Sequence, residues 1–104
     1  MSLDELFMLP SQGKCIVDCY ADWCGPCKRI APYFEELKEQ NPQVLFLKCN
    51  IDDNQEFAKK YNITSIPAFI TFVDGKETGR LVGADKSKLN DLIASLRNWL
   101  IFIC

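Results

Sequence analysis

Two cysteines, in the segment Cys24-Gly25-Pro26-Cys27, lie where one hydrophobic pattern gives way to another. Residues 15–20 form a short apolar run of β-branched and aromatic character, typical of a strand that is covered on both faces. From residue 27 to about residue 40 the apolar residues recur with a helical period. The chain must therefore pass from a buried strand into a helix at the cysteine pair, and this junction restricts the fold more than any other feature.

The position of the two cysteines favours redox chemistry. N–H groups in the first turn of a helix have no intrahelical partners, and the helix dipole stabilises negative charge there. A thiol at that point ionises more readily, and the thiolate is the nucleophile in disulfide exchange. Pro26 suits the first turn, because its missing N–H would have no partner there. The pattern predicts that Cys24 and Cys27, one helical turn apart, can close and reopen a disulfide.

The rest of the chain predicts a small α/β domain. Ser2 and Glu5 form a capping box for a short helix that begins at Leu3 and stops near Pro10. A hairpin with the turn Asp74-Gly75 follows the middle of the chain. The other expected elements are a strand over residues 44–50, a helix over 53–61, hairpin strands over 69–73 and 78–82, and a final helix capped by Asp85 or Ser87.

The composition of the chain limits the number of domains, the partners and the location that we expect. The chain has 104 residues, of which 48% are hydrophobic, so we expect one domain over residues 1–104. The net charge of −2 gives no reason to expect nucleic acid or an anionic membrane as a partner. No apolar run has the length of a membrane span, and the acidic N-terminus differs from a signal peptide. We therefore expect a reducing, cytoplasmic location.

The six cysteines raise the question of a metal site. Histidine is absent, which excludes zinc sites that contain it. A zinc site of Cys15, Cys19, Cys24 and Cys27 stays formally open, but the first two would lie about 13 Å apart along a strand. Zinc–sulfur bonds measure about 2.3 Å, so we expect no metal. Cysteines on the core strands should be inert packing residues, whereas Cys104 at the terminus should be more accessible.

The segment Trp23-Cys24-Gly25-Pro26-Cys27-Lys28 resembles the active site of the thioredoxin family. Ile66-Pro67 and Val82-Gly83-Ala84 follow in the family's order and at similar spacing, and the resemblance covers roughly residues 14–96. It implies the thioredoxin fold, a central mixed sheet flanked by helices. The family's usual N-terminal strand has no room before the first predicted helix, so four strands are expected.

The resemblance also implies an activity, namely reduction of protein disulfides without a bound cofactor beyond the redox-active Cys24–Cys27 disulfide. Cys24, expected to be the more exposed thiol, would attack the substrate disulfide, and Cys27 would then release the reduced substrate. The implied partners are disulfide-containing proteins and an NADPH-dependent thioredoxin reductase. Gly25-Pro26 between the cysteines resembles the reducing members of the superfamily. Two alternatives remain: a same-fold oxidoreductase that uses glutathione or another donor, and a binding or docking module.

Two charged residues interrupt the apolar strands, Asp18 in the first and Lys48 in the second. In thioredoxins the matching Asp lies beneath the cysteine pair and takes part in proton transfer to the second cysteine, and the matching Lys approaches it. Burial would raise the pKa of Asp18 into the range of a general base. Alternatively, Asp18 is a polar strand end or half of a buried ion pair, and Lys48 extends its amine to solvent.

The resemblance assigns substrate contacts to a set of residues around the cysteines. Pro67 would form a cis peptide bond facing them, and the backbone beside it would pair with the substrate. Gly83 fits a turn and would also let a partner's backbone come close. The full set is Trp23, Gly25, Pro26, Ile51, Ser65, Ile66, Pro67, Val82, Gly83 and Ala84.

The absence of the N-terminal strand would leave residues 44–47 at an edge of the sheet, where unpaired backbone groups favour the addition of another strand. The apolar tail, residues 99–104, continues the helical period of the last helix, so helix is favoured over strand for it. The edge would then stay open, and the sequence allows a weak homodimer.

Overall fold

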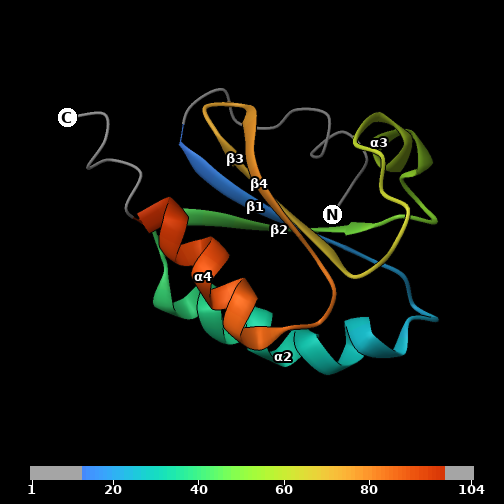
Figure 1. Ribbon diagram of the computed structural model, residues 1–104, viewed down its shortest axis with the longest axis horizontal. Coiled ribbons are helices and arrows are strands. Elements are labelled where there is room, and N and C mark those ends of the chain that lie inside the picture. Colours follow the sequence, from blue (N-terminus) through green and yellow to red (C-terminus); the bar gives the residue numbers. More distant parts are fainter. Residues whose placement is uncertain (1–12, 98–104) are drawn as a thin grey trace.

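The computed structural model describes residues 13–97. Four strands form one mixed sheet in the order β2-β1-β3-β4, and three helices cover it (Figure 1). The elements in chain order are β1 (Lys14–Tyr20), α2 (Gly25–Gln40), β2 (Val44–Asn50), α3 (Gln55–Lys60), β3 (Ala68–Val73), β4 (Lys76–Val82) and α4 (Lys86–Arg97). The four predicted strands are confirmed. The predicted helix near residues 3–10 and the tail at residues 99–104 lie outside the described residues.

Strand directions place the cysteine loop at one end of the sheet. β1 runs parallel to β2, with Asp18 directly opposite Lys48 and Cys19 opposite Cys49. β3 runs antiparallel to β1, and β4 antiparallel to β3. The end of β1, the start of β3 and the end of β4 consequently meet at the same end of the sheet. The loops that leave this end carry the predicted site.

The helices lie on both faces of the sheet. α2 and α4 cover one face and α3 covers the other (Figure 1). Phe34 of α2 is fully buried against the first face, with its ring centroid 5.1 Å from that of Phe46 and 5.8 Å from that of Phe69. Aromatic pairs at such separations contribute about 0.5–1.5 kcal/mol each beyond their burial. The stripe predicted for α2 is confirmed, because Ile30, Phe34 and Leu37 all face this core.

Several element ends differ from the sequence prediction, among them β4, which begins at Lys76 rather than residue 78, whereas the predicted cap of α4 is confirmed. α2 begins at Gly25 rather than Cys27, because Pro26 occupies a first-turn position where no N–H is needed. α3 covers only Gln55–Lys60, since Asn62, at φ 55°, turns the chain out of the helix. α4 begins after Asp85, whose carboxylate accepts the N–H of Lys88 at 3.0 Å, so Asp85 rather than Ser87 is the cap.

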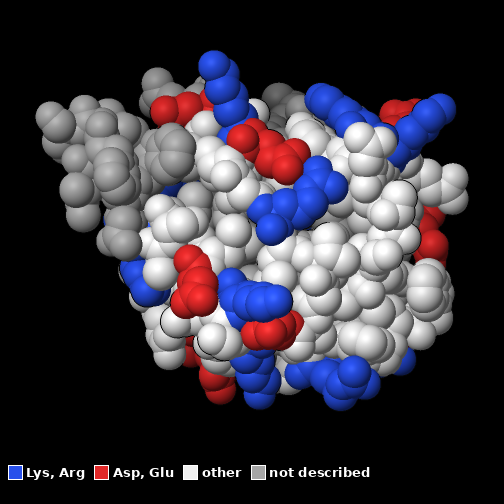
Figure 2. Space-filling view, in the orientation of Figure 1, with Lys and Arg blue, Asp and Glu red and all other residues white. Residues whose placement is uncertain are grey.

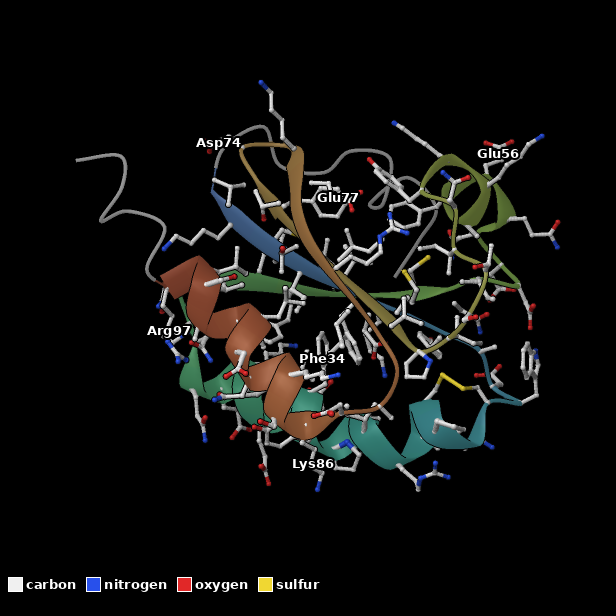
Figure 3. All side chains as sticks on the ribbon, viewed as in Figure 1. Phe34, Glu56, Asp74, Glu77, Lys86 and Arg97 are labelled. Carbon is white, nitrogen blue, oxygen red and sulfur yellow. A yellow bond between two sulfur atoms is a disulfide. The ribbon has the colours of Figure 1, made fainter. Side chains whose placement is uncertain are left out.

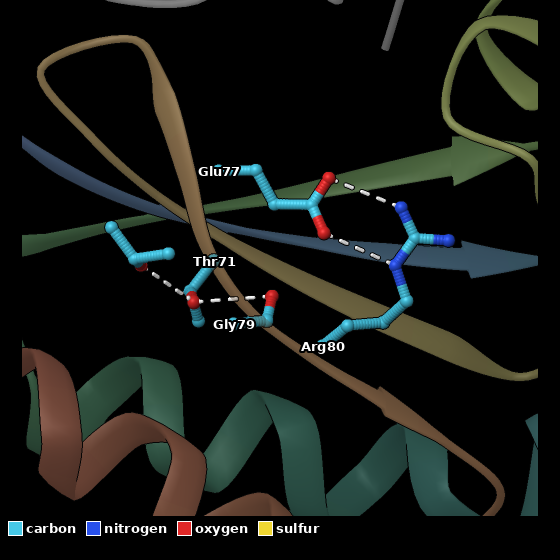
Figure 4. A network of polar contacts seen from close by, with 5 residues as sticks. Thr71, Glu77, Gly79 and Arg80 are labelled. Carbon is cyan, nitrogen blue, oxygen red and sulfur yellow. Dashed lines mark hydrogen bonds and ion pairs between the residues drawn. The ribbon is translucent and has the colours of Figure 1, made fainter.

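The β3–β4 hairpin turns at Asp74 and Gly75, both at positive φ, as a tight hairpin requires. The register shifts beyond Thr71, where Thr78 is the extra residue of a bulge. The buried Thr71 hydroxyl contacts the Thr78 hydroxyl at 2.9 Å and donates to the Gly79 carbonyl at 3.3 Å (Figure 4). A Cβ atom at Gly79 would lie 3.0 Å from a Leu92 methyl carbon. The close packing of α4 therefore explains why glycine, which weakens a strand, stands at this position.

No helix within residues 13–97 combines the length and the apolar character needed to cross a membrane. The sheet edge at β2 includes Leu45, which is 46% exposed. Within the described part of the chain, β2 pairs only with β1, as expected for a sheet of four strands.

Candidate active site

Cys24 and Cys27 form a disulfide at the start of α2, drawn as the yellow sulfur–sulfur bond in Figure 3. Their Cα atoms lie 5.3 Å apart. Cys24 has the extended backbone of a helix cap, and its Sγ accepts the N–H of Cys27 at 3.2 Å. A sulfur at that position receives both a hydrogen bond and the field of the helix, which stabilise a thiolate. The geometry therefore supports the prediction that Cys24 is the nucleophile.

Exposure does not distinguish the two sulfurs, contrary to the expectation that Cys24 is the more open. In the disulfide state Cys24 is 5% exposed and Cys27 is 4% exposed. The disulfide ties both sulfur atoms against the surrounding apolar residues, which are Ala21, Tyr20, Ile51 and Ile66. The distinction between the cysteines therefore depends on the capping position of Cys24.

The predicted cis peptide bond between Ile66 and Pro67 is confirmed. It faces the disulfide, because the Cys24 Sγ lies 3.9 Å from the Ile66 carbonyl oxygen. The Gly83 N–H donates to the Pro67 carbonyl at 2.9 Å, which brings the end of β4 to the same place. Three segments far apart in the sequence thus surround one sulfur pair.

The remaining predicted substrate contacts differ in how closely they approach the sulfurs. Trp23 is 69% exposed and Val82 is 56% exposed, so two large apolar side chains lie open beside a buried disulfide. Ile51 and Ile66 pack directly on the cysteines. Gly25, Ser65 and Ala84 are exposed, whereas Pro26 and Gly83 are half-buried. The structure gives Ser65 no contact with the pair, so only its place before Ile66 connects it with the site.

Asp18 lies beneath the disulfide, where it lines a cavity of about 120 Å³ together with Cys27 and Lys48. Asp18 is 2% exposed, and its Oδ1 has no hydrogen-bond partner in the described structure. Burial raises the pKa of the Asp18 carboxyl to about 7, although the positive charge of Lys48 opposes this and Glu35 adds to it. The cavity is large enough for a water molecule between Asp18 and Cys27.

The two alternatives for Asp18, a polar strand end or half of a buried ion pair, find little support among the described residues. Asp18 is in the middle of β1 and not at its end. The sole ion pair within 4 Å in residues 13–97 joins Arg80 to Glu77, so Asp18 forms none with Lys48. The Lys48 amine lies 4.7 Å from the centre of the Tyr20 ring. Lys48 is therefore held over an aromatic ring next to the cavity.

Sequence reasoning missed two residues of the site, Tyr20 and Asp52. Tyr20 positions the Lys48 amine through a cation–π contact and lines the same cavity as Asp18. Asp52 accepts the Trp23 indole N–H at 2.8 Å and so fixes the exposed ring beside the disulfide. The position of Tyr20, an aromatic residue at the end of β1, could have indicated that it belongs to the site. No local pattern distinguishes Asp52 from the neighbouring Asp53.

The other described cysteines lie apart from the disulfide. Cys15, Cys19 and Cys49 are free and at most 1% exposed, on the face of the sheet that α3 covers. Burial raises the pKa of the Cys15 thiol to about 12. A hydrogen bond to Cys49, together with burial, raises the pKa of Cys19. Among residues 13–97, no three His, Cys, Asp or Glu side chains gather closely enough to hold a metal ion.

The burial of these three cysteines predicts the order in which the thiols of the chain react with an alkylating reagent. In the folded protein, brief treatment with an alkylating reagent should leave Cys15, Cys19 and Cys49 unlabelled, because burial keeps the reagent away from all three thiols and raises the pKa of Cys15 and Cys19. Cys104, which lies outside the described residues, is predicted from its terminal position to react first. Peptide mass spectrometry checks the order, and denatured protein serves as the control for full labelling. Early labelling of Cys19 or Cys49 would contradict the buried strand positions.

A second prediction concerns the reduced site. The pKa of Cys24 should fall well below the ordinary value of about 8.5, because its sulfur caps α2, and Cys27 should react more slowly. Alkylation rates of the freshly reduced protein over a pH series, with each cysteine followed separately by mass spectrometry, measure both. Equal rates at the two positions would remove the assignment of Cys24 as the nucleophile.

The sheet order, the disulfide at the start of α2 and the facing cis-proline define a thiol–disulfide oxidoreductase. The family model described as Thioredoxin matches residues 5–96. Thioredoxin 1 of Plasmodium falciparum is 45% identical over 78 residues, 75% of each chain, and thioredoxin-1 of Saccharomyces cerevisiae is 41% identical over 80 residues, 77% of this chain and 78% of that protein. The match to thioredoxin-like protein 1 of Schizosaccharomyces pombe, 40% identical, covers 83% of this chain but only 30% of that longer protein.

Solved structures agree with the sequence relatives. The crystal structure of Fasciola hepatica thioredoxin superposes with a TM-score of 0.80 at 42% identity, over 83% of this chain and 84% of that one. A second structure is described as giving the structural basis of the thiol-resolving mechanism in yeast mitochondrial 1-Cys peroxiredoxin via glutathione/thioredoxin systems. It superposes with a TM-score of 0.84 at 32% identity, over 89% of this chain and 88% of that one. The chain belongs to the thioredoxin family.

Proposed function

We propose that this protein reduces disulfides in other proteins and is itself reduced by an NADPH-dependent thioredoxin reductase. The observation that carries the proposal is the disulfide at the start of α2, with one sulfur capping the helix and lying opposite the cis-proline. The exposed Trp23 and Val82 beside it offer apolar contact area for a protein substrate. A substrate segment can therefore lie across the loops while its disulfide reaches Cys24.

The reaction proceeds by two exchanges. The Cys24 thiolate attacks one sulfur of the substrate disulfide, forms a mixed disulfide and releases the other substrate sulfur as a thiolate. Cys27 then loses its proton and attacks the Cys24 sulfur, so that the substrate leaves with both sulfurs reduced and the protein holds the Cys24–Cys27 disulfide. Two electrons pass from the protein to the substrate, and a donor must return them.

We assign Asp18 to the second exchange. Its carboxylate lies on the same small cavity as Cys27, and its raised pKa of about 7 suits a group that accepts a proton near neutral pH. A water in the cavity would carry the proton from the Cys27 thiol. Lys48, held over Tyr20, limits how far the pKa of Asp18 rises, because its positive charge favours the carboxylate.

One assay separates the candidate donors. Insulin is supplied as a disulfide-containing protein, and its reduction is followed with NADPH plus thioredoxin reductase, and then with glutathione plus glutathione reductase. We expect rapid turnover in the first system and slow turnover in the second. Faster turnover with glutathione than with thioredoxin reductase would favour the glutathione alternative. The description of the yeast peroxiredoxin structure mentions glutathione beside thioredoxin. No turnover in either system would favour the docking module.

We further propose a reducing, cytoplasmic location and a weak homodimer. The three free buried thiols, Cys15, Cys19 and Cys49, suit a reducing compartment. The exposed Leu45 on β2 supports pairing of that edge with a second copy. Light scattering over a concentration series, on the full chain and on a chain ending at Asn98, measures the association. A strict monomer in both at high concentration would rule out the dimer.

A further inference from the structure

A hollow of about 470 Å³ lies between α2 and the loop from β4 to α4, lined by Arg29, Ile30, Ala84 and Lys86. It adjoins the active site at two points. Ala84 follows Gly83, whose N–H is bonded to the carbonyl of the cis-proline. The Arg29 guanidinium extends back over the cysteine loop, since a side-chain carbon at Gly25 would lie 3.7 Å from its Nη1. A group placed in this hollow therefore lies next to the disulfide.

The hollow carries two positive charges that no described carboxylate neutralises. Arg29 and Lys86 are both exposed, and the single ion pair within 4 Å among residues 13–97 lies elsewhere, between Arg80 and Glu77. The Lys86 amine lies 5.6 Å from the centre of the Tyr33 ring. Asp85, the acidic residue nearest in sequence, uses its carboxylate to cap α4. Lys86 points outward at the start of α4 in Figure 3.

The hollow differs in charge from the cavity beside Asp18, which carries both signs because Asp22, Lys28 and Lys48 line it together. Asp22 receives a hydrogen bond from Asn50, and Asp52 receives one from Trp23. In Figure 2 the right-hand part of the lower border, beneath α2, carries Lys and Arg side chains next to a broad uncharged area. A substrate that crosses the site therefore meets positive charge without carboxylates only at the hollow, and complementary charge would fix its direction.

We propose that this hollow receives an aspartate or glutamate side chain of the protein substrate, located on one side of the cysteine that Cys24 attacks. The inference rests on the proposed function and names the substrate class for it. Arg29 supplies a planar, bidentate partner for the carboxylate, and Lys86 adds a second charge. Such an ion pair accelerates encounter and orients the substrate while leaving the exchange chemistry unchanged.

The test uses three disulfide-linked peptide homodimers that differ only beside the cysteine. One carries two glutamates on the N-terminal side, one carries them on the C-terminal side, and one carries glutamines. Fully reduced protein is mixed with each peptide at low salt, and single-turnover rate constants are measured by chromatography, so that no external donor enters. We expect one of the two acidic peptides to react roughly fivefold faster than the glutamine peptide. The advantage should shrink at high salt.

Charge reversal identifies the residues responsible. Arg29→Glu combined with Lys86→Glu should remove the advantage of the faster acidic peptide and leave the glutamine peptide within about twofold of wild type. The matched control, Lys38→Glu with Lys76→Glu, changes the net charge equally at exposed positions remote from the disulfide and should keep the advantage. Equal rates for the acidic and glutamine peptides in wild type, or an advantage that survives the Arg29/Lys86 reversal, would overturn the inference.

The result for the glutamine peptide separates this inference from the proposed function. If the wild-type protein fails to reduce that peptide and insulin alike, the reductase function itself fails. If it reduces them but shows no preference for the acidic peptides, the function stands and the hollow has no role in substrate choice. Circular dichroism spectra that match wild type show that both double variants are folded.

Discussion

Cys24→Ser should abolish disulfide reduction, with a loss of at least about 10⁴-fold in rate, as expected when a nucleophile is removed. A hydroxyl cannot replace a thiolate stabilised by the first turn of α2, and Cys27 does not cap the helix. The measurement is insulin reduction under conditions where wild type turns over many times. Cys15→Ala removes a cysteine elsewhere in the chain and should keep most of the activity, so a comparable loss in that control would point to misfolding.

Cys27→Ser separates the two exchanges. The first attack should proceed, because Cys24 keeps its position at the helix start, but the mixed disulfide should persist since no thiol one turn along the helix can resolve it. Non-reducing electrophoresis and intact mass spectrometry should show a 1:1 covalent adduct with insulin. Such an adduct in the Cys24→Ser variant instead would reverse the roles of the two cysteines. The trapped form also captures natural substrates from an extract.

Asp18→Asn should have a large effect on the second exchange alone. An amide cannot accept the proton of Cys27, so resolution of the mixed disulfide should slow about 10²-fold while the first attack by Cys24 changes little. Stopped-flow measurements that follow the mixed disulfide and the released thiol separately test this. Asp91→Asn, an exposed position on α4, is the control. Unchanged product release in the Asp18 variant would remove Asp18 from the mechanism.

The same substitution should change the pH dependence of stability. The folded pKa of Asp18, about 7, lies above the ordinary value of 3.8, so between these pH values the folded state holds a proton that the unfolded state has lost. The free energy of unfolding should therefore fall as pH rises from about 4 to 7, by up to about 4 kcal/mol from this carboxyl. Asp18→Asn has no such group, and its advantage over wild type should widen across that interval.

Urea unfolding of the oxidised proteins at pH 4, 6 and 8 measures the effect. A constant difference between wild type and the Asp18→Asn variant would show that Asp18 titrates at its ordinary value despite its burial. The Asp91→Asn variant, which removes an exposed carboxyl on α4, is the control.

Much of the fold was accessible from the sequence, because its elements have strong local signals. The two-residue turn at Asp74 and Gly75, the helix stripe around Phe34 and the transition at the cysteines depend on patterns within one segment. Asp18 lies opposite Lys48 only because β1 and β2 pair in one particular register. The family resemblance suggested that these two residues approach each other, and the strand pairing confirms it. The bond between Trp23 and Asp52 and the hollow beside Arg29 join residues from different segments, so no local pattern contains them.

The pairing of β1 with β2 also bears on which changes of chain length the protein tolerates. Lys48 and Cys49 are neighbours on β2, but one faces the cavity of Asp18 and the other the tightly packed cysteine side of the sheet. Deleting one residue from the connection at 41–43 would shift β2 by one position and exchange these two environments. A lysine would then enter an apolar core while a neutral thiol faced the buried carboxyl. The length of this three-residue connection therefore determines whether Lys48 lies beside Asp18, the residue proposed to accept the proton of Cys27.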